Sequence, residues 1–212
     1  MIDIRSQLEA IHREVGEGND EDAVGVLLRR SYDATIEDVW NALTDPRRME
    51  RWFLPVSGDL RQGGNFQLEG NAGGDILDCE PPRLLRVTFG APNSIVELRL
   101  AVDTGSETVL ELEHTVPMEM ARSVAGALYV GPGWDGALLG LDLYLRGETT
   151  DDPVAAANSV EAQEFSKQSV YEWRAAVEAA GTASSEEIAA GVEMSLAQFA
   201  PDLDAQEPDT AS

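Results

Sequence analysis

The segment 131–146 carries its large apolar residues at helical spacing. These residues stand at i, i+4, i+7 and i+11, namely Trp134, Leu138, Leu141 and Leu145. The spacing places them on one face of a predicted amphipathic helix, with Ala137 and Tyr144 beside the stripe. Burial of each large side chain contributes roughly 1.5–3 kcal/mol, so this helix must cover another apolar surface.

The chain before this helix supplies such a surface, because short runs alternate between apolar and polar residues. In the run 95–103, Leu98 and Leu100 alternate with Glu97 and Arg99. This alternation is typical of antiparallel strands with one buried and one solvated face. We predict seven strands, at residues 23–32, 57–61, 65–69, 75–80, 84–89, 95–103 and 108–116. Turns are predicted at Gly63-Gly64, Gly73-Gly74, Pro81-Pro82, Pro92-Asn93 and Thr104-Gly105.

Three further helices are predicted before the meander of strands. Ile4, Leu8, Ile11 and Val15 repeat at helical spacing and indicate a helix over residues 3–15, followed by an acidic linker over 16–22. Thr35 has the features of an N-cap, because Asp38 stands where its carboxylate can reach back. The pair Asp45-Pro46 then begins a second short helix.

The chain beyond position 150 is predicted to be a helical extension. One helix should end at Gly181, and a capping box formed by Ser184 and Glu187 should begin another that Pro201 closes. We therefore divide the chain into residues 1–22 (helix and acidic linker), 23–150 (main domain), 151–200 (extension) and 201–212 (disordered tail). Since both terminal regions carry apolar stripes, we expect the extension to fold back on the domain or to join a homodimer.

Composition narrows the choice of partners and compartment. The formal charge of −24 makes nucleic acid and anionic membrane surfaces poor partners, because phosphates would be repelled. The single cysteine, Cys79, excludes an internal disulfide, and we interpret it as a packed thiol. The sequence shows neither a signal core nor a run of about 18 apolar residues. We therefore expect a cytoplasmic protein that does not span a membrane.

His114 is the ionisable residue with the clearest chemical interest. It shares strand parity with Leu110 and Leu112, so it should point toward the long helix. An inward histidine could orient a ligand carbonyl or act as acid or base. The alternative, which we favour, is a core histidine bonded to another protein group, because no nucleophile or carboxylate can be paired with it.

Aromatic residues before and on the long helix are candidates for the wall of an apolar pocket. Simple core packing is the alternative for each of them, and the hydroxyl of Tyr144 either bonds a ligand or faces solvent. The two histidines and one cysteine do not stand at metal-ligand spacing, so neither metal nor cofactor is predicted. The candidate ligand-contacting residues are Trp52, Phe53, Phe66, Phe89, Leu98, Leu112, His114, Trp134, Leu138, Leu141 and Tyr144.

The order strand, two short helices, six strands and long helix resembles the START-like (SRPBCC) helix-grip superfamily. Within it, the chain is similar to bacterial proteins that resemble the C-terminal domain of the activator of the heat-shock protein 90 ATPase. The likeness covers about residues 23–147. The phrases that carry it are Thr35 to Trp40, Asp45-Pro46, Arg51-Trp52-Phe53, Gly74 to Pro82, Leu112-Glu113-His114 and Gly133-Trp134 through Leu145.

The resemblance implies an α+β fold in which a curved seven-stranded antiparallel sheet grips the long helix around a hydrophobic cavity. It implies no single activity, because relatives include ligand carriers, cyclases, hydrolases and co-chaperone domains. Three hypotheses follow: binding of a small hydrophobic or amphipathic ligand, a cyclase-like or hydrolase-like pocket that uses His114, and a co-chaperone-like domain that acts on a heat-shock ATPase.

Overall fold

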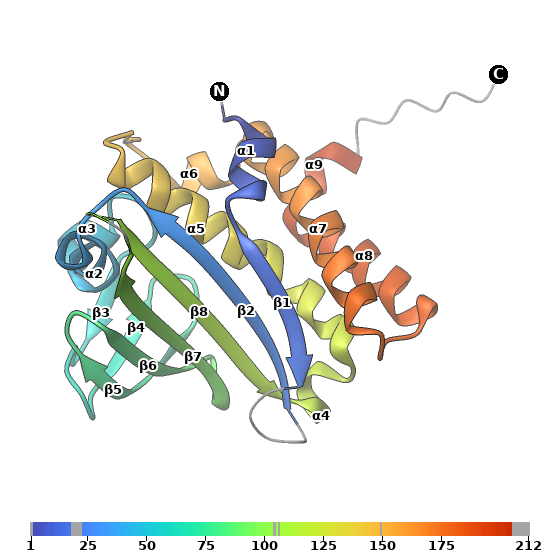
Figure 1. Cartoon of the computed structure of the whole chain (residues 1–212), viewed down its shortest axis with the longest axis horizontal. Coiled ribbons are helices and arrows are strands. Elements are labelled where there is room, and N and C mark those ends of the chain that lie inside the picture. Colours follow the sequence, from blue (N-terminus) through green and yellow to red (C-terminus); the bar gives the residue numbers. More distant parts are fainter. Residues whose placement is uncertain (1, 18–22, 104, 106, 149, 205–212) are drawn as a thin grey trace.

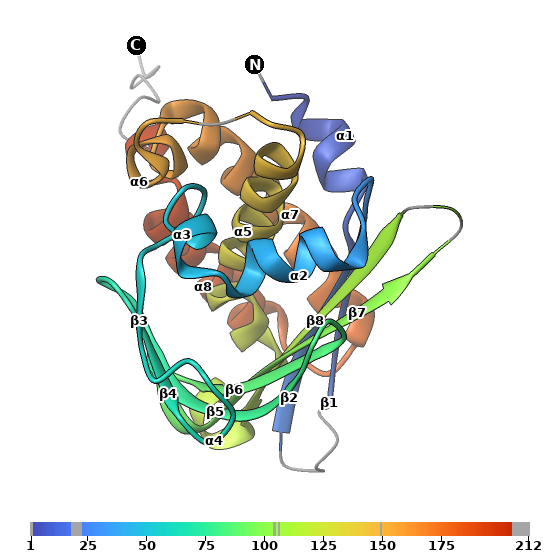
Figure 2. The same ribbon diagram turned by 90° about the vertical axis from the view of Figure 1, so that its left-hand side faces the viewer.

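A curved antiparallel sheet wraps around the long helix α5 (Gly131–Leu145) in the computed structural model (Figures 1 and 2). The structure describes residues 2–17, 23–103, 105, 107–148 and 150–204. Within these ranges the sheet has eight strands in the order β1-β2-β8-β7-β6-β5-β4-β3. The predicted helix-grip fold is therefore confirmed, with one strand more than the sequence indicated.

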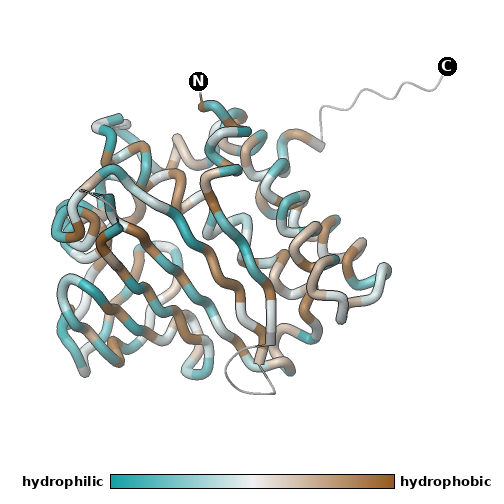
Figure 3. Tube along the Cα trace, in the orientation of Figure 1, coloured by the Kyte–Doolittle hydropathy of each residue, from teal (hydrophilic) through white to brown (hydrophobic). Residues whose placement is uncertain are grey.

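Hydrophobic and hydrophilic residues alternate along the strands, as the colouring of the chain shows (Figure 3). The hydrophobic ones are mostly buried in the core with α5. On β8, for example, Leu110, Leu112 and His114 are buried, while Glu111 and Glu113 lie on the other face. The bounds are β1 (His12–Glu17), β2 (Ala23–Tyr32), β3 (Val56–Gly58), β4 (Asn65–Leu68), β5 (Gly73–Glu80), β6 (Leu84–Phe89), β7 (Ala91–Val102) and β8 (Thr108–Pro117).

The additional strand comes from the predicted N-terminal helix. Helix α1 covers only Ile4–Glu9, and residues 12–17 form β1, which pairs antiparallel with β2. The expectation of one helix over residues 3–15 was wrong, because the later half also fits a period of two. Arg13 and Val15 point inward there, while His12 and Glu14 are exposed. The predicted linker lies partly in β1, and residues 18–22 are outside the described ranges.

Two predicted turns lie inside strands instead. Gly73-Gly74 opens β5, where a Cβ on Gly74 would collide with the carbonyl oxygen of Thr88 on β6. Pro92-Asn93 belongs to β7, because the chain turns two residues earlier at Gly90, whose φ is +76°. Such a positive φ is easily adopted by glycine. Gly74 thus allows two strands to approach closely and does not form a turn. The turn predicted at Pro92-Asn93 lies instead at Gly90.

The short helices near the sheet were predicted correctly. Helix α2 (Ile36–Thr44) begins after Thr35, whose hydroxyl accepts the backbone N–H of Asp38. Helix α3 (Pro46–Met49) begins after Asp45, whose carboxylate accepts the N–H of Arg47. Helix α2 contacts α5 and β7, and α3 contacts β3, so both helices lie beside α5 over the sheet (Figure 2).

The C-terminal extension folds back on the far side of α5 (Figure 1). Its elements, with those that precede α5, are α4 (Met118–Ala121), η1 (Val124–Tyr129), α6 (Pro153–Ala157), α7 (Val160–Ala180), α8 (Ser185–Phe199) and α9 (Pro201–Asp204). Gly181 ends α7 at φ 74°, and the capping box of Ser184 and Glu187 begins α8. Helix α9 occupies the start of the tail that was predicted to be disordered, and residues 205–212 lie outside the described ranges.

Helix α5 is covered by apolar residues on both sides. The prediction of an amphipathic helix was therefore wrong. Leu138 and Leu141 face the main core under the sheet, whereas Leu139 packs with Leu8 of α1 and Phe165 of α7. Among the glycines of α5, Gly131 has the closest neighbour, and this neighbour also belongs to the extension: a Cβ on Gly131 would collide with the indole of Trp173 on α7. The low helix propensity of this segment is thus compensated by packing on two faces.

No helix in the described ranges combines the length and the apolar character needed to cross a bilayer.

Candidate functional site

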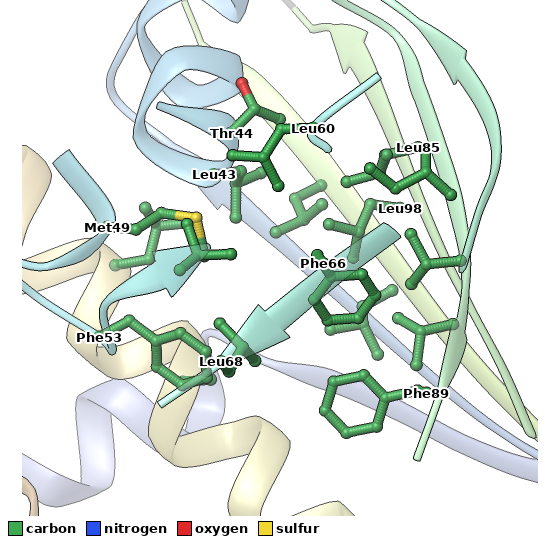
Figure 4. A pocket seen from close by; sticks show the side chains of 18 of the residues that line it. Leu43, Thr44, Met49, Phe53, Leu60, Phe66, Leu68, Leu85, Phe89 and Leu98 are labelled. Carbon is green, nitrogen blue, oxygen red and sulfur yellow. The ribbon is translucent and has the colours of Figure 1, made fainter. Parts of the chain in front are cut away.

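An apolar cavity of about 180 Å³, here called the first cavity, lies between the sheet, α2, α3 and α5 (Figure 4). Met49 and Phe53 lie on its helical side, and Leu85 and Leu98 project from the sheet opposite them. The exposed residues Leu60 and Arg61 also line it, which places its opening near the segment between β3 and β4.

The few polar side chains of this lining are already bonded within the protein. The hydroxyl of Thr44 donates to the carbonyl of Trp40, and the indole N–H of Trp52 donates to the carbonyl of Ala42. At the rim, Arg61 pairs with Asp59. The thiol of Cys79 also faces the cavity region, and burial raises its pKa. A ligand in the first cavity would therefore be held by burial of apolar surface rather than by hydrogen bonds.

The structure brings most of the candidate residues together around this cavity. Those that line it are Trp52, Phe53, Phe66, Phe89, Leu98, Leu112, Trp134, Leu138 and Leu141. His114 and Tyr144 do not line it. Tyr144 points instead toward α3, where its hydroxyl accepts a hydrogen bond from Nε of Arg48 at 3.0 Å.

His114 is buried, 6% exposed, and both ring nitrogens have partners. The indole N–H of Trp134 approaches Nδ1 at 3.1 Å, and Oγ of Ser94 lies 2.9 Å from Nε2. Because an indole N–H can only donate, Nδ1 is the acceptor, and the ring proton therefore resides on Nε2 and is donated to Ser94. Burial lowers the pKa of His114 to about 4, so the ring is neutral at pH 7.

A second cavity of about 260 Å³ lies on the other side of this histidine. It is lined by residues of β2, β7, β8, α4 and η1, and its polar lining includes Ser94 and His114. The rings of Phe89, His114 and Trp134 pack with centroids 5.3–5.9 Å apart. Since Phe89 and Trp134 line the first cavity and His114 the second, these three rings form a partition between the two.

Sequence reasoning missed a set of buried charges behind α5. The carboxylate of Asp135 is fully buried and accepts from Nε of Arg13, from Oγ of Ser169 and from the indole N–H of Trp173, at 2.9, 2.5 and 3.1 Å. Burial raises the pKa of Asp135, and the positive charge of Arg13 opposes that rise. Through these hydrogen bonds, Asp135 of α5 is joined to β1 and to α7.

About two helical turns further along α5, the buried carboxylate of Asp142 is bonded in a similar way. Asp142 bonds Nη2 of Arg30 on β2 at 2.9 Å and the amide of Gln7 on α1 at 3.1 Å. Two acids seven residues apart on an otherwise apolar helix were the signal available in the sequence. The partner of Asp135 could not be inferred from the sequence, because Arg13 was predicted to lie in a helix. In the described ranges, no group of three or more His, Cys, Asp and Glu side chains could hold a metal ion.

Comparisons with known proteins agree on the family and the fold. Residues 33–146 match the model of the activator of Hsp90 ATPase homolog 1-like protein family. The chain is similar to the crystal structure of CalU16 from Micromonospora echinospora, with 40% identity, 79% of this chain and 98% of that chain covered, and a TM-score of 0.65. The solution structure of CalU16 gives 40% identity, coverage of 81% and 97%, and a TM-score of 0.67.

A more distant likeness supports the fold alone. The structure of a conserved protein of unknown function, EF2215 from Enterococcus faecalis, is 15% identical, with 82% of this chain and 95% of that chain covered and a TM-score of 0.54. No curated protein sequence matches the chain.

Proposed function

This chain belongs to the activator of Hsp90 ATPase homolog 1-like family, and from that premise we propose that it binds a small hydrophobic molecule in the first cavity. The observation that carries the proposal is the volume of about 180 Å³ enclosed by apolar side chains whose polar neighbours are already bonded. For scale, an engineered cavity of about 150 Å³ with similar walls binds benzene. The proposed contacts are Trp52, Phe53, Phe66, Phe89, Leu98, Leu112, Trp134, Leu138 and Leu141.

The driving force for this binding is the removal of apolar ligand surface from water. Each Å² buried contributes roughly 25 cal/mol, and the preformed walls need little reorganisation. The opening beside Leu60 would let a longer or amphipathic molecule keep its polar end in solvent. Neither a metal nor a cofactor enters the proposal.

The test uses N-phenyl-1-naphthylamine, a neutral dye whose fluorescence rises when it leaves water. We expect saturable binding that Leu98→Trp weakens at least tenfold, because the indole would fill the cavity. Val102→Trp is the matched control, since Val102 lies on the same strand and parity but is 61% exposed. Equal binding by both variants and the unchanged protein would refute the proposal.

Native mass spectrometry of the freshly purified protein provides a second readout. A co-purified lipophilic molecule that is absent from the Leu98→Trp variant would support the same site. A matching ligand should also raise the melting temperature by mass action.

The geometry gives no support to the alternative in which His114 acts as acid or base on a ligand of the first cavity. Its ring lies outside that lining, and both nitrogens are engaged by Ser94 and Trp134. A general acid or base must reach the proton that it transfers.

A chaperone role is the second candidate, because the family description names an activator of the Hsp90 ATPase. The test is to add the purified protein to an Hsp90-type ATPase and measure ATP hydrolysis. An unchanged rate at saturating protein would count against it. The formal charge of −24 restricts such contact to surfaces that are not themselves strongly acidic.

A further inference from the structure

We propose that the second cavity is a separate binding site for a small, neutral, mostly apolar molecule that carries one carbonyl or ether oxygen, held by the hydroxyl of Ser94. The inference does not rest on the proposed function of the first cavity. The volume of the second cavity, about 260 Å³, is sufficient for a substituted aromatic ring.

The first step in the argument is the direction of the hydrogen bonds. The indole of Trp134 donates to Nδ1 of His114, and Nε2–H of His114 donates to Oγ of Ser94. The hydroxyl oxygen of Ser94 is therefore an acceptor in this chain, and its own proton must be donated elsewhere. Among the described residues this proton has no acceptor.

The second step is burial. Ser94 is 4% exposed, so its hydroxyl is largely withdrawn from bulk water, and it lines the second cavity. A buried donor without a partner is costly, and donors in a chain polarise one another. An acceptor oxygen inside the cavity would complete the chain that begins at Trp134.

The third step is the nature of the remaining wall. The lining from β2, from η1 and from the residue after η1 is apolar, with Val24, Val26, Ala127 and Val130, and Tyr129 adds an aromatic residue. No charged side chain is among the residues that line the cavity. An anionic ligand would therefore lack a counter-charge, whereas a neutral ketone or ether has the required acceptor and an apolar body. A water molecule fits this wall poorly, because it needs two to four polar partners.

The partition of aromatic rings keeps the two sites distinct. Phe89 and Trp134 face the first cavity, and His114 faces the second. A change that fills one cavity should therefore leave the other available. This separation makes the two proposals testable independently.

The experiment compares acetophenone with ethylbenzene, which has a similar shape but no acceptor. The affinities of both ligands are measured by ligand-observed NMR titration. Hydrogen bonding is followed separately through the ¹⁵N shifts of the His114 ring, which His12→Gln allows to be assigned because the chain has two histidines. We expect acetophenone to shift Nε2 and ethylbenzene to leave it nearly unchanged. Ser94→Ala should weaken acetophenone about tenfold more than ethylbenzene, as the loss of one hydrogen bond implies.

Two controls make the result specific. Ser57→Ala, at an exposed serine of β3, should change neither affinity. Leu98→Trp should weaken dye binding in the first cavity at least tenfold without altering the His114 response to acetophenone.

Three results would overturn the inference. One is an equal loss of both ligands in Ser94→Ala, and another is the absence of any shift at His114 up to the solubility limit of acetophenone. The third is a ring proton on Nδ1 rather than Nε2 of His114 in the unchanged protein, which would reverse the direction of the hydrogen bonds. This result can be obtained even if the Ser94→Ala variant does not fold.

Discussion

His114 should make folding stability depend on pH in a window where a solvent-exposed histidine would not. In the unfolded chain the imidazole titrates near 6.5, whereas burial lowers its pKa in the folded protein to about 4. Between these values the unfolded state binds a proton that the folded state does not. Stability is therefore fully present above pH 6.5 and is lost as the pH falls toward 4.

The magnitude follows from the separation of the two pKa values. Each pKa unit corresponds to about 1.36 kcal/mol, so the shift from 6.5 to about 4 implies a loss of roughly 3 kcal/mol. The ring is neutral in the fold because burial disfavours its charged form, and the indole N–H of Trp134 donates to Nδ1 of the neutral ring. That loss is a substantial fraction of the total stability of an ordinary domain.

The assay is urea unfolding of the unchanged protein and of His114→Gln, measured in steps from pH 7 to pH 4. Many carboxylates also titrate in acid, so the informative quantity is the difference between the two free energies of unfolding. We expect this difference to change by about 3 kcal/mol across the window. His12→Gln is the matched control, because His12 is exposed on β1. Parallel profiles for the unchanged protein and His114→Gln would refute the reasoning.

Two other predictions concern the faces of α5. Nothing lies within 4 Å of a Cβ built on Gly136, whereas a Cβ on Gly131 would collide with an indole of α7. Gly136→Ala should thus raise the free energy of unfolding by roughly 0.5–1 kcal/mol, and Gly131→Ala should lower it by about 1–3 kcal/mol. A loss of stability in Gly136→Ala, or a gain in Gly131→Ala, measured by urea unfolding, would contradict this. Arg13→Met should cost about 3–5 kcal/mol, because it leaves Asp135 buried and unpaired. Exposed Arg5→Met should change stability by no more than about 0.5 kcal/mol.

The sequence was sufficient for the elements whose period is unambiguous. Residues 110–114 alternate cleanly, and the N-cap at Thr35 and the glycine stop at Gly181 have local causes that act within a few residues. Residues 12–17 were assigned wrongly because Ile11 and Val15 fit both a period of two and a helical turn. Only the partner strand β2 decides between them.

The candidate site was predictable in its apolar part and not in its polar part. Strand parity placed Leu112 and His114 inward, and the helical stripe placed Leu138 and Leu141 opposite them. Which cavity His114 would face could not follow from parity, because it depends on Ser94 one strand away. Long-range pairing of this kind leaves no local trace in a single sequence.

The packing of α5 against α1 and α7 explains how the fold can leave space between α5 and the sheet. An unfilled apolar volume costs about 24 cal/mol per Å³, so the first cavity of about 180 Å³ destabilises the fold by about 4 kcal/mol. On the opposite side, Trp173 and Phe165 are fully buried or nearly so, and Asp135 joins β1 to α7. These contacts hold α5 in place in addition to the packing of Leu138 and Leu141 under the sheet. The sheet-facing residues are thereby released from filling the core, and a bound apolar molecule would recover the stability that the empty volume costs.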